Sequence, residues 1–312
     1  MKLQEIFDLA IEMGRRADLR SDKAIENQLK KIAKNFAHLS DAEKKRYPKE
    51  KLANPYPDTL IHWGDPEKEI KRILVTIDAT EGKLLIGKEV GADLVLAHHP
   101  TGKSLALLPD AMKLQMYLYA KWGVPINIVE GLMRKRIDEV RRSIHAVNNF
   151  LVPDSARLLD MPLINVHTPT DNLVLNFIEN KLKEKKPKYV GSIIKMLNGI
   201  PEYQEAAERG SAPRIFAGSA KNHSGKIIAS EITGGTDGAE KIYSHLANAG
   251  IGTVISMHQS ESYRKEAEKS FINVVIASHI ASDSLGMNLF VDELEKRGVE
   301  ILPTGGFIRV KR

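Results

Sequence analysis

Four separate apolar runs in this sequence end on histidine. They are DLVLAHH at His98 and His99, PLINVH at His167, TVISMH at His258 and NVVIASH at His279. In open α/β sheets, ligand-binding groups gather at the carboxyl ends of strands. A single His-His pair is also explained by a solvated loop. Because four strand ends share the pattern in a chain of only ten histidines, we predict one metal or catalytic cluster.

Two of these histidines have a carboxylate four residues later. His167 is followed by Asp171, and His279 by Asp283. An imidazole and a carboxylate from a strand end and its loop suit borderline divalent ions such as Zn, Fe, Mn or Co. Asp283 also has a structural interpretation as the N-cap of the helix that SDSLGMNLF predicts, and the two roles are compatible. The chain has no cysteine, which excludes thiolate metal sites, cysteine nucleophiles and disulfides.

The double histidine carries geometric information. Neighbouring side chains on an extended backbone point to opposite sides, so His98 and His99 are poorly placed to chelate one ion. Reaching toward two ions from a turn is easier. A glycine-rich stretch at 232–241, ITGGTDGAEK, lies between a predicted strand and a predicted helix. Its backbone N–H groups could receive a phosphate, but it matches neither a P-loop nor a dinucleotide fingerprint, and a plain tight turn is the alternative.

The elements that position these residues follow from periodicity. Residues 1 to about 52 have helical spacing of apolar side chains, and NPYPDT then breaks the pattern. Next come a β-branched run (IKRILVTIDAT), a helical stretch (EGKLLIGKEVG) and the strand before the double histidine, which together predict a βαβ unit and a parallel sheet. Residues 227–258 repeat the order strand, turn, helix, strand, histidine, so the chain is predicted to be internally duplicated.

Composition narrows the class of protein. The chain has 312 residues, of which 42% are hydrophobic and 28% charged, as in an ordinary globular protein. The net charge of +6 includes the basic runs GLMRKRIDEVRR and KLKEKKPK. Acids interrupt both runs and neither has spaced aromatics, so a solvated helix face is favoured and nucleic acid is a minor alternative. With no signal-peptide pattern and no apolar stretch near the roughly 20 residues of a membrane span, we expect a cytoplasmic protein without membrane contact.

Three segments resemble the Nif-three-like family, which is named after the NGG1p-interacting factor and includes type 2 GTP cyclohydrolase I homologues. The segments are DPEKEIKRILVTIDAT with GADLVLAHHP, HTPTD, and INVVIASHIASDSLG. The resemblance runs from about residue 55 to the C-terminus. It implies an α/β fold of two intertwined lobes built from a repeat, with mixed or mainly parallel sheets, two divalent metal ions in the cleft, and a homo-oligomeric ring such as a hexamer. The implied lobes are 1–165, including the extra N-terminal helices and completed by 275–312, and 166–274. The implied metal ligands are His98, His99, Asp171, His279 and Asp283.

The sequence departs from the family pattern at two points near the expected site. Asp283 stands where the family usually has Glu, and Ser256, Met257 and His258 replace a Thr-Gly-acid run. We therefore expect His258 to lie outside the ligand set, supporting the ligands or facing the substrate, and we name it as the candidate catalytic residue. The longer N-terminal helical segment and the missing insertion between the lobes indicate a distinct subgroup.

Two functions remain open from the sequence. The first is a dinuclear metal-dependent hydrolase of a small molecule: a nucleotide, a phosphoester or a purine ring. The second is a non-catalytic metal-binding or protein-interaction module. A ligand set of His and Asp alone leaves coordination positions for water, which favours the first.

Overall fold

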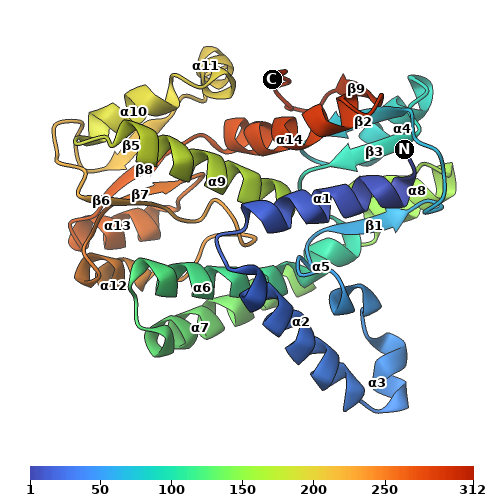
Figure 1. The fold of residues 1–312 in the computed structure, drawn as a ribbon, viewed down its shortest axis with the longest axis horizontal. Coiled ribbons are helices and arrows are strands. Elements are labelled where there is room, and N and C mark those ends of the chain that lie inside the picture. The colour runs from blue at the N-terminus through green and yellow to red at the C-terminus, as the bar shows by residue number, and fades with distance from the viewer.

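The computed structural model describes residues 1–312 and contains two mixed β-sheets with helices around and between them (Figure 1). The first sheet runs in the order β1 (Leu60–Trp63), β4 (Leu163–Asn165), β3 (Leu94–Ala97), β2 (Arg72–Thr76) and β9 (Glu300–Pro303). The second runs in the order β5 (Arg214–Ala217), β8 (Asn273–Ile276), β7 (Ile251–Ser256) and β6 (Lys226–Ala229). The predicted α/β fold with mixed sheets is confirmed.

Helices precede the first strand, as the sequence predicts. They are α1 (Leu3–Ala17), α2 (Asp22–Ala37), α3 (Asp41–Arg46) and the 3-10 helix η1 (Lys49–Leu52). The remaining helices are α4 (Glu81–Glu89), α5 (Gly102–Ala111), α6 (Lys113–Trp122), α7 (Ile126–His145), α8 (Leu151–Leu159), α9 (Thr168–Lys185), α10 (Val190–Leu197), α11 (Pro201–Glu208), α12 (Ile242–Asn248), α13 (Glu261–Lys269) and α14 (His279–Glu295). No helix combines the length and apolar character needed to cross a bilayer.

The two sheets are built on one plan. In each, the first strand along the chain, β1 or β5, is an antiparallel edge strand. The next three strands pair in parallel and lie in the same spatial order. Strand β9 adds a fifth, parallel member beside β2. The duplication inferred from the sequence therefore appears in strand order and direction, and the histidines at the ends of β3, β4, β7 and β8 come from equivalent places.

Both faces of the first sheet are covered. In β2, Ile73 and Val75 pack in one apolar cluster with α1 and α14, while Leu74 points the other way into a cluster with α4 and α8. This explains why β2 and β3 read as continuous apolar runs rather than alternating ones. Helices α5–α7 instead share the core of the second sheet. The proposed lobe boundaries, 1–165 with 275–312 and 166–274, stay a prediction.

Helices α9 and α14 meet closely between the two sheets (Figure 1). An added Cβ at Gly286 of α14 would lie 2.4 Å from the Thr170 carbonyl oxygen and 2.8 Å from Val174 Cγ2. Only glycine allows this approach, because real Cβ atoms do not come so near a backbone atom. The contact matters for function because Thr170 neighbours Asp171 and Gly286 lies in the helix that carries Asp283.

We expect Gly286→Ala to destabilise the protein by about 1–3 kcal/mol, since the helices must separate to admit the methyl group. The measurement is urea unfolding followed by circular dichroism. Gly131→Ala in α7 is the matched control, because nothing lies within 4 Å of its added Cβ. That change should stabilise by about 0.5–1 kcal/mol through helix propensity. Equal effects of the two substitutions would contradict the close α9–α14 contact.

Candidate metal centre

The structure brings all five predicted ligands together. His98 and His99 directly follow β3, and Asp171 lies in the first turn of α9 after β4. His279 and Asp283 lie four residues apart at the start of α14, after β8. The ligands therefore come from both halves of the duplicated chain.

The interpretation of Asp283 as a helix N-cap is wrong. Helix α14 begins at His279, so Asp283 lies inside the helix. The flanking residue, Ser278, has a φ of 76° in the left-handed region, which a non-glycine residue adopts at a cost and mostly at functional sites. Its carbonyl accepts a hydrogen bond of 2.7 Å from Ser282 Oγ. The early start of the helix places His279 and Asp283 on one helical face.

Asp283 lies between two groups of ligand atoms. Its Oδ1 is 3.5 Å from His98 Nε2, which in turn is 3.4 Å from Asp171 Oδ1. Its Oδ2 is 3.3 Å from His99 Nε2 and 3.5 Å from His279 Nε2. We call His98, Asp171 and Asp283 the first group, and His99, His279 and Asp283 the second; in each, the ligand atoms lie within 4.8 Å of one another. One carboxylate thus belongs to both groups.

The buried atoms that face each other here have no hydrogen-bond partner. They are both carboxylate oxygens of Asp283, Oδ1 of Asp171 and Nε2 of His98. Leaving such a polar atom unpaired costs about 1–3 kcal/mol, more when it is charged. Cations held by the two groups would satisfy all of these atoms. The donor set, imidazole nitrogen and carboxylate oxygen, is compatible with a divalent metal.

The other nitrogen of two ligand histidines is held from outside. Thr170 Oγ1 donates to the Val166 carbonyl, so it accepts from His98 Nδ1 at 3.0 Å. Asp78 Oδ1 accepts from His99 Nδ1 at 2.7 Å. Both contacts hold a proton on Nδ1 and leave Nε2 as the nitrogen that would bind a metal, the arrangement that supports metal-bound histidines. Asp78 lies two residues after the end of β2, so the strand-end rule could have identified it.

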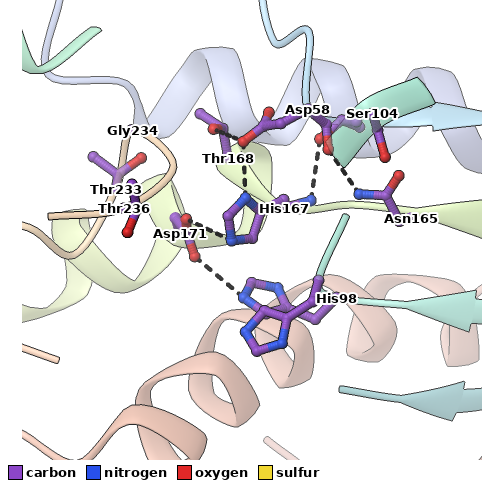
Figure 2. A network of polar contacts seen from close by, with 12 residues as sticks. Asp58, His98, Ser104, Asn165, His167, Thr168, Asp171, Thr233, Gly234 and Thr236 are labelled. Atoms are coloured by element: carbon purple, nitrogen blue, oxygen red, sulfur yellow. Dashed lines mark hydrogen bonds and ion pairs between the residues drawn. The ribbon is translucent and has the colours of Figure 1, made fainter. Parts of the chain in front are cut away.

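A fourth imidazole, His167, forms a third group of possible ligands with His98 and His99, and it lies beside Asp171 (Figure 2). Its Nδ1 is 2.8 Å from Asp58 Oδ2, which also accepts from Thr168 Oγ1 at 2.6 Å. Its Nε2 is 3.8 Å from Asp171 Oδ2. The sequence places His167 at a strand end, but the ligand set implied by the resemblance leaves it out. Asp58 is buried and lies in the proline-rich break before β1, a place that carries no recognisable signal.

His258 lies at the edge of the centre. Its Nδ1 is 2.6 Å from Asp237 Oδ1, and its ring centroid is 4.9 Å from that of His279. It belongs to neither of the two groups that share Asp283. Burial lowers its pKa, but the hydrogen bond and charge of Asp237 outweigh this and raise it above the usual histidine value.

The glycine-rich stretch predicted from the sequence forms a loop beside the centre. Figure 2 shows Thr233, Gly234 and Thr236 next to Asp171. Thr233 Oγ1 donates to Asn172 Oδ1 at 2.8 Å, and Gln115 Nε2 donates to the Gly234 carbonyl at 3.0 Å. These contacts fix the loop against α9 and α6. Phosphate binding by this loop stays a prediction.

Burial and neighbouring charges separate the pKa values of the ligands. Burial lowers the pKa of His98 to about 4, so this ring is neutral at pH 7. Burial opposes charge on His99 as well, but the neighbouring carboxylates of Asp283 and Asp78 raise its pKa to about 10. Burial raises the pKa of Asp171 to about 8. Burial also acts to raise the pKa of Asp283, but His98 and the other histidines hold it below the usual range.

We expect metal affinity to rise steeply between pH 6 and 8. An ion must displace the protons that His99 and Asp171 hold in this range, since their pKa values are about 10 and about 8. The metal-bound state therefore binds fewer protons, and affinity increases by about tenfold per pH unit for each proton displaced. Competition against a chelator of known affinity measures this at pH 6, 7 and 8. An affinity independent of pH would contradict the assigned ligands.

Comparison with known proteins finds sequence and fold similarity to the NIF3 family. The family model Duf34/NIF3 (NGG1p interacting factor 3) matches residues 51–104. A Clostridium perfringens protein named GTP cyclohydrolase 1 type 2 homolog is 51% identical over 37 residues, which are 12% of this chain and 14% of that protein. The crystal structure of a NIF3 superfamily protein from Sphaerobacter thermophilus has a TM-score of 0.77 and 24% identity, covering 97% of both chains. Reduced HcgD from Methanocaldococcus jannaschii has a TM-score of 0.50 and 15% identity, covering 78% of this chain and 87% of that one.

Proposed function

We propose that this chain, as a member of the Duf34/NIF3 family, is a dinuclear metal-dependent hydrolase. Its substrate would be a nucleotide, a phosphoester or a purine ring. The observation that carries the proposal is the position of Asp283, whose two unpaired oxygens face two separate groups of ligand atoms. A carboxylate shared in this way suits a pair of ions rather than one.

The ligand set favours a catalytic centre over a purely structural one. Each group offers three protein ligands, which leaves coordination positions for water and substrate. Zn, Fe, Mn and Co all accept such nitrogen and oxygen donors. When bound, two such ions would supply Lewis-acid polarisation and electrostatic stabilisation of an anionic oxygen.

His258 is the residue we assign to proton transfer. Asp237 holds its Nδ1, so Nε2 is the nitrogen left for substrate, and 34% of the side chain is exposed. Its raised pKa favours the protonated ring near neutral pH. A protonated imidazole at the edge of the centre is suited to donate a proton to a leaving group, as a general acid does.

Purified protein with measured metal content tests the proposal against a panel of nucleotides, model phosphoesters and purine compounds. We expect turnover that disappears when a chelator removes the metal and returns when the metal is restored. A fully metal-loaded protein without turnover on the panel would instead support the second candidate, a non-catalytic metal-binding or protein-interaction module.

Self-association is part of the proposal. Phe150 and Leu158, at either end of α8, are 74% and 84% exposed, and Phe271 is 93% exposed. A homo-oligomer such as a ring of six chains would cover these side chains. Light scattering that finds only a monomer at micromolar concentration would refute it.

A further inference from the structure

A glycine pair outside the ligand set, Gly305 and Gly306, lies next to the metal centre. Thr304, Gly305 and Gly306 follow β9, which pairs in parallel with β2. Parallel strands end at the same edge of a sheet, so this loop lies at the edge where β3 presents His98 and His99. The backbone of this segment, called here the β9 loop, takes left-handed conformations at both glycines, with φ of 57° and 87°.

The β9 loop connects the metal centre to Lys83. A Cβ added to Gly306 would lie 3.7 Å from Ile280 Cγ2, and Ile280 is the neighbour of His279. A Cβ added to Gly305 would lie 2.1 Å from Thr76 Oγ1 and 2.9 Å from Lys83 Cε. The loop therefore touches the helix of His279 on one side and the lysine on the other.

Lys83 is a cation without an acidic partner. Its ammonium donates to Thr304 Oγ1 at 3.3 Å, and it forms no ion pair with any carboxylate, although Glu81 lies on the same turn. The side chain is half-buried in the first turn of α4, a nine-residue helix capped by Thr80. The positive end of the helix dipole adds to the charge of the lysine. Lys83 follows the same strand end as Asp78, which binds His99 of the second group.

We infer that Lys83 and the β9 loop bind an oxyanion, a phosphate group of the substrate, beside the second group of ligands. The inference rests on the proposed function, because it names the group that the substrate presents next to the reacting bond. An ammonium with one hydroxyl partner keeps donors for an anion, and the missing side chain of Gly305 lets Lys83 pack against the β9 loop. Hydrogen bonds between charged groups are about twice as strong as neutral ones.

Calorimetric titration of the metal-loaded protein with inorganic phosphate tests the inference without requiring turnover. We expect Lys83→Met to weaken phosphate binding about tenfold or more, with unchanged metal content, and Lys83→Arg to restore most of it. Lys71→Met is the matched control: it removes an exposed lysine at the opposite end of β2 and should leave the affinity as in wild type.

Thr304→Val supplies a second variant that removes only the hydroxyl partner of the ammonium. It should weaken phosphate binding less than Lys83→Met does. Wild-type affinity in Lys83→Met, equal weakening by Lys71→Met, or no phosphate binding by the wild-type protein would each overturn the inference. If phosphate binding depends on Lys83 while no substrate turns over, the anion site stands and the proposed hydrolase function fails.

Discussion

Asp283→Asn is expected to leave the chain without bound metal at concentrations that fill the wild-type protein. Oδ1 of this carboxylate belongs to the first group and Oδ2 to the second. An amide removes the negative charge and replaces one oxygen with a donor that would face a histidine nitrogen. Changes to residues that only support a ligand already cost about 10- to 100-fold in metal affinity, and loss of a shared ligand should cost more.

Asp171→Asn separates the two groups. This residue belongs only to the first group, so we expect metal content at or below one half of wild type while circular dichroism stays unchanged. The surface control is Asp154→Asn on α8, where the Asp154 side chain is 66% exposed; this variant should bind metal normally.

The outcome for Asp283→Asn decides whether Asp283 is shared. A folded Asp283→Asn protein that holds as much metal as wild type would show that the Asp283 carboxylate is not shared.

His258→Ala is expected to keep both ions and to lower kcat on any substrate the panel identifies by about 100- to 10,000-fold, the usual contribution of general acid–base catalysis. The ring lies outside both ligand groups that share Asp283, so its loss should not release metal. Steady-state kinetics together with elemental analysis of the same sample measure both effects.

Two further variants limit how a loss of activity in His258→Ala can be interpreted. Asp237→Asn should give a smaller loss in the same direction, and the double substitution should cost little more than His258→Ala, because Asp237 acts through the histidine. His145→Ala, at the exposed end of α7, should have no effect. Release of an ion from His258→Ala would show that this residue is a ligand, and an unchanged kcat would remove it from catalysis.

The sequence was informative where local pattern and topology coincide. The strands before His98, His167, His258 and His279 are short apolar runs. Parallel pairing brings the ends of β3 and β4 to one edge of the first sheet, and those of β7 and β8 to one edge of the second. Duplication of the chain could also be predicted from the sequence, because each half repeats the order of strand, helix and strand. The confirmed α/β fold could thus be predicted from hydrophobic periodicity and from the rule that ligand-binding groups gather at the carboxyl ends of parallel strands.

Contacts between distant segments could not be predicted in this way. Asp58 binds His167 across 109 residues, and nothing near Asp58 indicates that it will be buried. The start of α14 was misplaced because serine and aspartate at 282 and 283 look like a helix cap, whereas the backbone at Ser278 turns early to begin the helix. Lys83 and the β9 loop meet across 221 residues, and only the pairing of β2 with β9 brings them together.

Metal stoichiometry tests the central claim most directly. The purified chain is stripped with a chelator, reloaded with Zn, Mn, Fe or Co in turn, freed of excess ion and measured by elemental analysis against protein concentration. The arrangement of two ligand groups sharing Asp283 predicts close to two ions per chain for at least one of these metals, falling to none in Asp283→Asn. One ion or none per chain with every metal would contradict a dinuclear centre.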